Sequence, residues 1–184
     1  MTAISLPRPL DRSEAFFWFL DHFSSMNFAV IAECDARFSG DALQAALATA
    51  GQRHPLLNAG IDTVDGRLHF VPNAATGIPL EEVVAADWRT ALAERIVRPF
   101  ALGEAPLVRA VAIDDTAGGS VLALIFHHVA GDARSAFPVL TEVLAALAGK
   151  ALDPAGEELL PPLSALYPPQ LVGEAGRLAL EQLK

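Results

Sequence analysis

Cysteine is almost absent from this chain. The single cysteine, Cys34, excludes an intramolecular disulfide and cannot by itself supply the ligands of a structural zinc site. Because it lies in an apolar stretch, we expect it to be a small buried residue with no chemical role. These absences predict a protein of a reducing compartment that holds its fold by packing.

Basic residues and long apolar runs are also scarce. Lys and Arg total 13 against 22 Asp and Glu, for a net charge of −9, and no basic stripe is available to neutralise nucleic-acid phosphates. We interpret the acidity as favouring solubility rather than steering a cationic partner. No run approaches the roughly 18 apolar residues of a membrane span, and the start "MTAISLPRPLDRSE" lacks the pattern of a signal peptide. A soluble, cytoplasmic protein that binds no nucleic acid is expected.

What the chain does contain is apolar material. Of its 184 residues 52% are hydrophobic and 19% charged, which is typical of a packed domain of ordinary size, or of one half of a larger one. From residue 153 the sequence becomes proline-rich. We therefore divide it into a folded unit, 1–152, and a Pro-rich connector that ends in an amphipathic stretch, 153–184.

Periodicity predicts a sheet with helices packed on it. Asp11 and Glu14 resemble a capping box. The aromatic residues that follow suggest that the first helix is buried on more than one side. We expect Trp18 of this helix and Trp88 of a later helix to pack in the core. Asp65-Gly66 has the composition of a hairpin turn. The predicted helices are 12–23, 39–54, 87–100 and 135–149; the predicted strand is 27–38, and the hairpins are 58–72 and 106–126, the second with Gly118-Gly119 in its loop.

The segment "FHHVAGDARS", residues 126–135, ends the most apolar strand of the chain. Because successive strand residues point to opposite faces, His127 and His128 cannot both face one site if the strand persists. This disfavours a metal site that uses both. It leaves a single working histidine, for which a neutral imidazole at a strand end is suited as a general base.

The residues after the pair have several interpretations. Gly131 could adopt a positive φ and let the backbone turn tightly. Asp132 could orient an imidazole, cap the next helix or pair with an arginine, and Ser135 has the character of a helix cap rather than a nucleophile. The alternative to a catalytic histidine is a buried histidine that is only hydrogen-bonded, with Asp132 serving as a helix N-cap. A metallohydrolase is a more distant alternative.

The sequence resembles a known superfamily. "HHVAGD" (127–132) matches the HHxxxD signature of chloramphenicol acetyltransferase, the condensation domains of nonribosomal peptide synthetases, polyketide-associated acyltransferases of mycobacteria and wax-ester synthases. The resemblance covers roughly residues 8–172, through "LDRSEAFFWFLD", "RHPLL", "RPFALGEAPLVRAVAI" and "VLALIFHHVAGD". It implies an α/β sandwich like that of chloramphenicol acetyltransferase, with a mixed or antiparallel sheet.

The resemblance also implies roles for individual residues. His128 would be the general base that activates a hydroxyl or amine acceptor for attack on an acyl thioester, carried by coenzyme A or by the phosphopantetheine arm of a carrier protein. No metal and no permanently bound cofactor would be needed. His127 and Asp132 would be structural, with Asp132 held by Arg8 or Arg12. Gly131, Ala133 and Ser135 would lie against the substrates.

Two departures from the superfamily stand out. Its members usually have glycine after the aspartate, where this chain has Ala133, and they are built from two similar halves with the active site between them. Only the first half is recognisable here. We therefore expect a C-terminal half-domain or partner chain, whether the sequence is a fragment, a split subunit or a half that pairs with itself. The second hypothesis is a non-catalytic half that docks a carrier protein or subunit.

Overall fold

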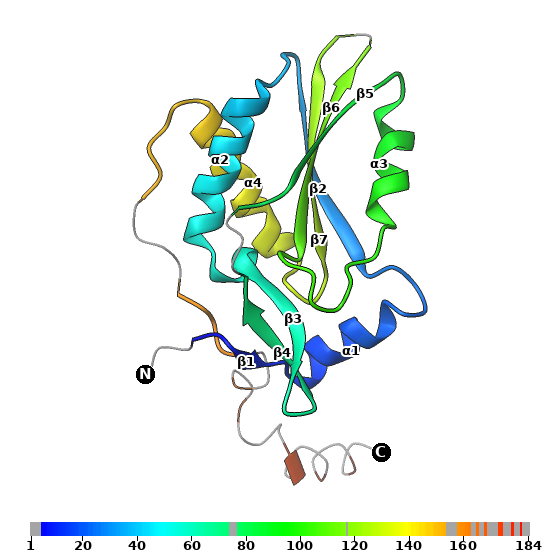
Figure 1. The fold of residues 1–184 in the computed structure, drawn as a ribbon, viewed down its shortest axis with the longest axis vertical. Helices are drawn as coiled ribbons and strands as arrows, with labels where there is room; N and C mark the ends of the chain where they lie inside the picture. Colours follow the sequence, from blue (N-terminus) through cyan, green and yellow to red (C-terminus); the bar gives the residue numbers. More distant parts are fainter. Residues whose placement is uncertain are drawn as a thin grey trace.

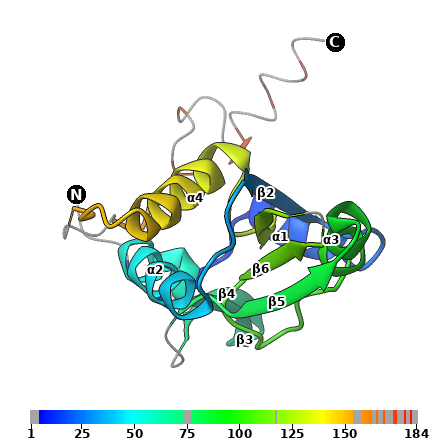
Figure 2. The same cartoon turned by 90° about the horizontal axis from the view of Figure 1, so that it is seen from above.

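The computed structural model describes residues 5–73, 77–116, 118–153 and 158–162, together with 165, 168, 173–174, 178 and 181. Most of the predicted 153–184 connector lies outside this part. The architecture is a four-stranded sheet covered by helices on both faces, with a three-stranded sheet below it (Figures 1 and 2). The helices are α1 (Arg12–Leu20), α2 (Gly40–Arg53), α3 (Trp88–Ile96) and α4 (Ala133–Leu147), with a short 3-10 helix η1 (Pro55–Asn58).

The larger sheet has the order β2-β7-β6-β5, formed by β2 (Asn27–Cys34), β7 (Ser120–His127), β6 (Val108–Asp115) and β5 (Leu80–Ala85). Only β5 and β6 pair in parallel, and β2, β7 and β6 are antiparallel. The smaller sheet has the order β1-β4-β3, with β1 (Arg8–Pro9), β4 (Arg67–Pro72) and β3 (Ala59–Val64). The predicted α/β class with a mixed sheet is confirmed.

Strand β7 is the centre of the fold, and all eight of its residues are buried. Leu122, Leu124 and Phe126 pack in the core under α2 and α4, whereas Ala123 and Ile125 pack on the opposite side with residues of α3 (Figure 2). A doubly covered strand has no solvent face, which explains its uninterrupted apolar sequence. Each fully buried Leu or Ile contributes about 1.5–3 kcal/mol through the apolar area removed from water.

Local signals set most element starts. Asp11 forms the predicted capping box with Glu14, and both turn residues of the β3–β4 hairpin have positive φ, 49° at Asp65 and 73° at Gly66, as a two-residue turn of the I′ type requires. Gly119 lies so close to β2 that a Cβ would be 2.8 Å from the carbonyl oxygen of Cys34. Both predicted hairpins are confirmed, because β3 pairs antiparallel with β4 and β6 pairs antiparallel with β7.

Several element ends differ from the prediction. The first two elements end at Leu20 and Cys34, and α3 ends at Ile96 before reaching Pro99. Strand β5 was not predicted, because "LEEVVA" has no hairpin partner beside it in the sequence and finds its pairing with β6 across an intervening helix. A helix or strand ends where its packing against the rest of the fold ends. The hydrophobic periodicity of the sequence does not show where that is.

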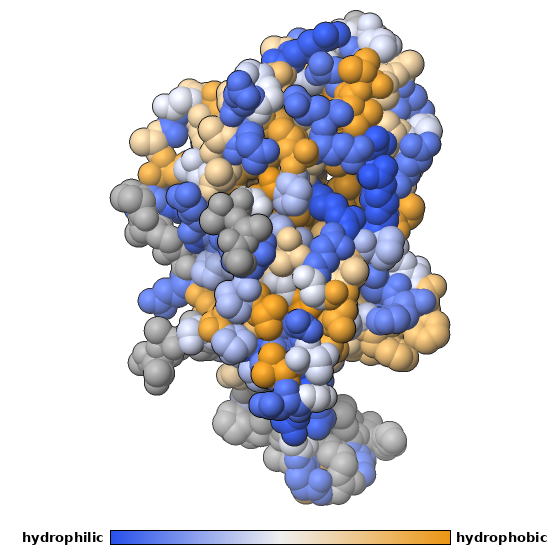
Figure 3. Space-filling model, viewed as in Figure 1, coloured by the Kyte–Doolittle hydropathy of each residue, from blue (hydrophilic) through white to orange (hydrophobic). Residues whose placement is uncertain are grey.

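Helix α1 is less buried than its ring content predicts. Trp18 is 8% exposed, but Phe16 and Phe19 are 55% and 57% exposed and Phe23, just after the helix, is 74% exposed. In Figure 3 a pale orange, apolar surface lies at the right of the lower half of the molecule, where Figure 1 shows α1. The predicted burial on several sides is therefore wrong within the described part of the chain.

Cys34 also departs from expectation. It is only half-buried, and the pKa of its thiol is raised by partial burial and by the neighbouring Asp35 carboxylate. Trp88 is likewise only partly buried. Over the described residues, no helix has the length and apolar character needed to cross a membrane.

Candidate functional site

The histidine pair lies where β7 ends and the chain turns toward α4. His127 is the last residue of the strand and is fully buried, with its ring 5.2 Å from Trp18 and 6.1 Å from Phe100, centroid to centroid. Its Nδ1 accepts a hydrogen bond of 3.0 Å from the Val129 amide. That bond closes the turn that presents His128.

The bond to Val129 determines which nitrogen of a neutral His127 ring carries the proton. Because Nδ1 accepts, the hydrogen must be on Nε2, which has no hydrogen-bond partner among the described residues and faces Asp21 Oδ1 at 3.7 Å. Burial lowers the pKa of His127, the Asp21 carboxylate opposes that shift, and His128 adds to it. His127 is thus built to stay neutral inside the fold.

His128 has different surroundings, as strand parity predicts. It is half-buried, and its ring stacks on Phe17 with centroids 4.6 Å apart and planes 3° from parallel. Phe28 touches it from another direction, at 5.1 Å and 54°. The backbone amide donates to the Met26 carbonyl, whereas no hydrogen bond to either ring nitrogen occurs within the described residues. Apolar rings therefore set the plane of the imidazole and leave its nitrogens available.

The stacking predicts that Phe17 positions the imidazole. If His128 is the general base that the resemblance implies, Phe17→Leu should lower kcat by roughly 10- to 100-fold, because small misplacements of a catalytic group are costly, and Phe17→Tyr should retain the wild-type value. The ring-current shift of the His128 NMR signals should vanish in Phe17→Leu alone. Phe16→Leu is the matched control, since that ring is 55% exposed on the same helix. Equal effects of both leucine variants would contradict the prediction.

Asp132 has a structural role as a helix cap, one of the roles that the sequence left open, but it has no arginine partner among the described residues. It is the N-cap of α4, accepting from the Ser135 amide at 2.9 Å, and the Ser135 hydroxyl completes a capping box. Arg8 instead pairs with Glu14 at 2.7 Å and 3.0 Å, and no arginine among the described residues is within ion-pair distance of Asp132. The hydrogen bonds from Ser135 lower the pKa of Asp132. The expected pairing with Arg8 or Arg12 is therefore wrong.

A pair of substitutions separates a cap from an ion pair. We expect Asp132→Ala to reduce the free energy of unfolding by about 1 kcal/mol, whereas Asp132→Asn, which also caps helices well, should change it by only a few tenths. Urea denaturation provides the measurement. A loss from Asn as large as that from Ala would show that the charge matters and that an arginine pairs with Asp132 in solution.

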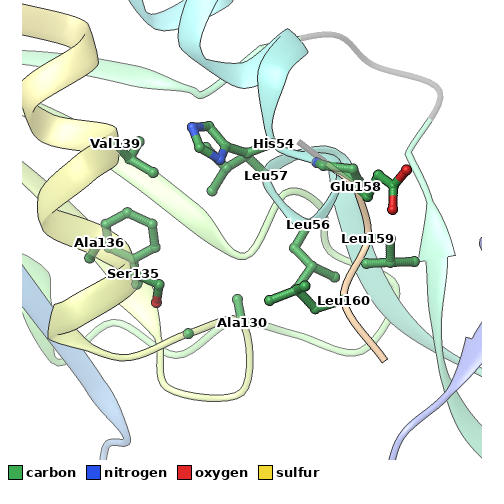
Figure 4. Close-up of a pocket in the computed structure, with 13 residues that line it drawn as sticks. His54, Leu56, Leu57, Ala130, Ser135, Ala136, Val139, Glu158, Leu159 and Leu160 are labelled. Carbon is green, nitrogen blue, oxygen red and sulfur yellow. The ribbon is translucent and has the colours of Figure 1, made fainter. Parts of the chain in front are cut away.

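The three residues predicted to lie against substrate do not form one group. Gly131 is not among the residues with positive φ, and a Cβ there would lie 2.6 Å from Ser135 Oγ, so a larger residue would displace the hydroxyl that completes the capping box. Ala133 is the exposed first residue of α4. Gly131 and Ser135 line the largely apolar cavity shown in Figure 4, and Ala133 does not.

That cavity has a volume of about 140 Å³ and lies between α4, the end of α2, η1, the turn after His128 and the segment 158–160. His128 does not line it, but Ala130 and Gly131 of the same turn do. Its apolar wall includes Leu56, Val139 and Leu160. Sequence reasoning missed these residues because single aliphatic side chains from separate segments form no motif.

Among the described residues, the remaining histidines and acidic side chains form no metal site. His54 Nε2 and Arg53 Nε both contact Glu142 Oε2, at 2.9 Å and 3.1 Å, and so join α2 to α4. Burial raises the pKa of Glu142, but the contacts with Arg53 and His54 lower it by more, so that its pKa lies below the usual value. Within the described residues, no group of three or more His, Cys, Asp or Glu side chains could hold an ion.

Comparison with known proteins shows which structures this fold is similar to. No protein-family model matches the sequence. In an alignment of 174 positions that covers 88% of the chain, it is 28% identical to the probable non-canonical nonribosomal peptide synthetase CymA of Salinispora arenicola, of which it spans 2%. The X-domain from teicoplanin biosynthesis superposes with a TM-score of 0.72 and 24% identity, over 86% of this chain and 37% of that one, and the X-domain has also been solved in complex with OxyB.

A further solved neighbour is a starter condensation domain, that of the rhizomide synthetase RzmA as its R148A mutant in complex with C8-CoA. It superposes with a TM-score of 0.65 and 14% identity, over 76% of this chain and 35% of that one. The chain therefore has the fold of the condensation-domain superfamily, as the HHxxxD resemblance predicts. It spans little more than a third of the length of these solved neighbours.

Proposed function

We propose that this chain is the part of a condensation-type acyltransferase that carries the general base, His128. The observation that supports this most directly is the contrast between the two histidines. His127 is sealed in the core and uses Nδ1 for the backbone, whereas His128 is clamped by Phe17 and Phe28 with both ring nitrogens available. A ring that is held in place but not saturated with hydrogen bonds is suited to proton transfer.

In the proposed reaction His128 accepts the proton of a hydroxyl or amine as that group attacks the carbonyl of an acyl thioester. The new carbon–oxygen or carbon–nitrogen bond forms, the carbon–sulfur bond breaks, and the departing thiolate receives the proton from the imidazolium. The balance requires no metal and no redox partner. His127 contributes by holding the turn through its bond to Val129, and Asp132 by beginning α4.

The donor in this proposal is an acyl group on coenzyme A or on a carrier-protein phosphopantetheine arm. The complex of the RzmA starter domain with C8-CoA supports a thioester of this kind. Because the chain spans only 35–37% of the solved neighbours, we propose that a C-terminal half-domain, or a partner chain, completes the cleft and excludes water from His128. A cytoplasmic location stays a prediction.

The function is tested by combining the chain with its second half-domain and following thioester consumption with and without an amine or hydroxyl acceptor. Acceptor-dependent release of free thiol, with the acyl group recovered on the acceptor, is the expected result. Thiol release that does not depend on the acceptor would identify hydrolysis and contradict the proposal.

A second candidate, a non-catalytic docking module, is favoured by the exposed rings of Phe16, Phe19 and Phe23 and by Ala133 in place of the usual glycine. The solved complex of the X-domain with OxyB supports the idea that this fold can serve in protein binding. A pull-down beside the turnover assay discriminates: tight binding of a carrier protein or subunit with no turnover in any assembly would favour docking.

A further inference from the structure

The end of α1 carries a buried carboxylate at a position that a helix disfavours. Asp21 is the C-cap of α1, where the negative end of the helix dipole repels an acidic group, and no basic residue in the last turn offsets this. Its side chain is only 10% exposed, and burying a carboxylate is costly unless it is hydrogen-bonded. A residue that conflicts with local rules in this way indicates a role set by the tertiary structure or by the site.

Two hydrogen bonds of Asp21 lead to the proposed base. Its Oδ1 accepts from the Met26 amide at 2.6 Å, and the Met26 carbonyl in turn accepts from the His128 amide at 2.9 Å. The backbone amide of Asp21 donates to the Phe17 carbonyl at 3.2 Å, and the ring of Phe17 stacks on His128. Asp21 therefore joins the helix that sets the plane of the imidazole to the peptide that holds its backbone.

The charge of Asp21 is directed at the other histidine. The same Oδ1 lies 3.7 Å from His127 Nε2, which is too far for a hydrogen bond. The carboxylate consequently acts on His127 through its charge alone, whereas it acts on the loop between α1 and β2 through the bond to Met26. Because these two effects differ in kind, substitutions at this one position can separate them.

Building on the acyl transfer proposed above, we propose that Asp21 is a positioning residue for the reaction, acting through its hydrogen bond to Met26. The bond closes the loop that leaves α1 and enters β2 (Figure 1), and so fixes the Phe17 ring relative to the His128 backbone. Without it, α1 and the turn that bears His128 could shift relative to each other. The imidazole would then lose the geometry that proton transfer requires.

Three substitutions separate the bond from the charge. Asp21→Asn removes the charge but keeps an oxygen within reach of the Met26 amide, and should leave kcat close to the wild-type value. Asp21→Ala removes the bond, and Asp21→Glu keeps the charge but extends the side chain by one methylene. Both should lower kcat by roughly 10- to 100-fold with an unchanged KM for the thioester, measured with the C-terminal half-domain or partner chain proposed above. Should Asp21→Ala fail to fold, the comparison of Asn with Glu remains decisive.

NMR of the chain provides a readout that does not depend on turnover. The ring-current shift that Phe17 imposes on the His128 signals should persist in Asp21→Asn and be lost in Asp21→Ala and Asp21→Glu. A loss in Asp21→Asn as large as in Asp21→Ala would show that the charge is the operative feature and overturn the role of the bond.

Ser120→Ala is the matched control. Ser120 is buried at the other end of β7, and its hydroxyl donates to the Ala36 carbonyl at 2.6 Å. This variant therefore also loses one bond from a side chain to a loop backbone. It should lower the urea midpoint but leave kcat and the His128 signals unchanged. A fall in kcat as large as that of Asp21→Ala would reveal a general loss of stability and overturn the positioning role.

Turnover and NMR together separate the two proposals. Loss of the ring-current shift in Asp21→Ala, with no His128-dependent transfer by the wild type, would refute the acyltransferase and retain Asp21 as the residue that orients the ring. Transfer by the wild type, with kcat and ring-current shift unchanged in Asp21→Ala and Asp21→Glu, would retain the acyltransferase and refute the role of Asp21.

Discussion

His128→Ala is expected to lower kcat for acyl transfer by about 10²- to 10⁴-fold, the contribution typical of a general base. The measurement combines the chain with the C-terminal half-domain or partner chain proposed above and follows thioester consumption at saturating acceptor. The ring makes stacking contacts with Phe17 and Phe28 but no ring hydrogen bond within the described residues. Its loss should therefore affect the proton transfer far more than the fold.

The control for His128 is His69→Ala. His69 is partly exposed on β4, with Nδ1 near the Arg67 carbonyl, and lies on the smaller sheet. We expect wild-type kcat from this variant, and closely similar urea midpoints for both variants and the wild type. Equal rates of wild type and His128→Ala, with both folded, would remove the proposed base and leave the docking module as the better explanation.

His127→Ala is expected to reduce the free energy of unfolding by about 3 kcal/mol or more, with little effect from His69→Ala. Removing a fully buried ring leaves a cavity beside Trp18 and Phe100, and the Val129 amide loses its acceptor. His127→Asn should lose less, because its side-chain oxygen can accept from Val129. Unfolding of His127→Ala at the wild-type urea concentration would contradict this account.

The same residue predicts a pH dependence of stability. Burial lowers the pKa of His127 in the folded chain, so the unfolded chain, with a pKa near 6.5, binds the proton first. Stability from the neutral ring is therefore complete above about pH 6.5 and is lost as the pH falls below it. Because Asp21 opposes the shift, the loss should be moderate. His127→Asn should flatten this part of the profile relative to wild type, and an unchanged slope would argue against a buried neutral ring.

Several features of the structure are specified by local sequence alone. Asp11 and Asp87 begin helices because their carboxylates accept the first free amides, and Asp65-Gly66 begins a hairpin because both residues tolerate positive φ. The apolar run before the histidines determines a doubly covered strand, and the alternation of side chains then separates His127 from His128. Each of these effects acts within a few residues, and the sequence therefore specifies it directly.

Tertiary packing decided the rest. Asp132 caps α4, and Arg8, expected to pair with it, is instead committed to Glu14. Phe17 on α1 reaches His128, 111 positions later in the chain. The cavity takes its walls from η1 and the preceding His54, from β7, the turn after His128 and α4, and from the segment 158–160. By itself the sequence determined that the two histidines face opposite sides, because strand geometry is local, whereas the structure decided that His127 is the buried one. What surrounds the accessible one depended on contacts between distant segments, whose pairing is settled only when the whole core packs.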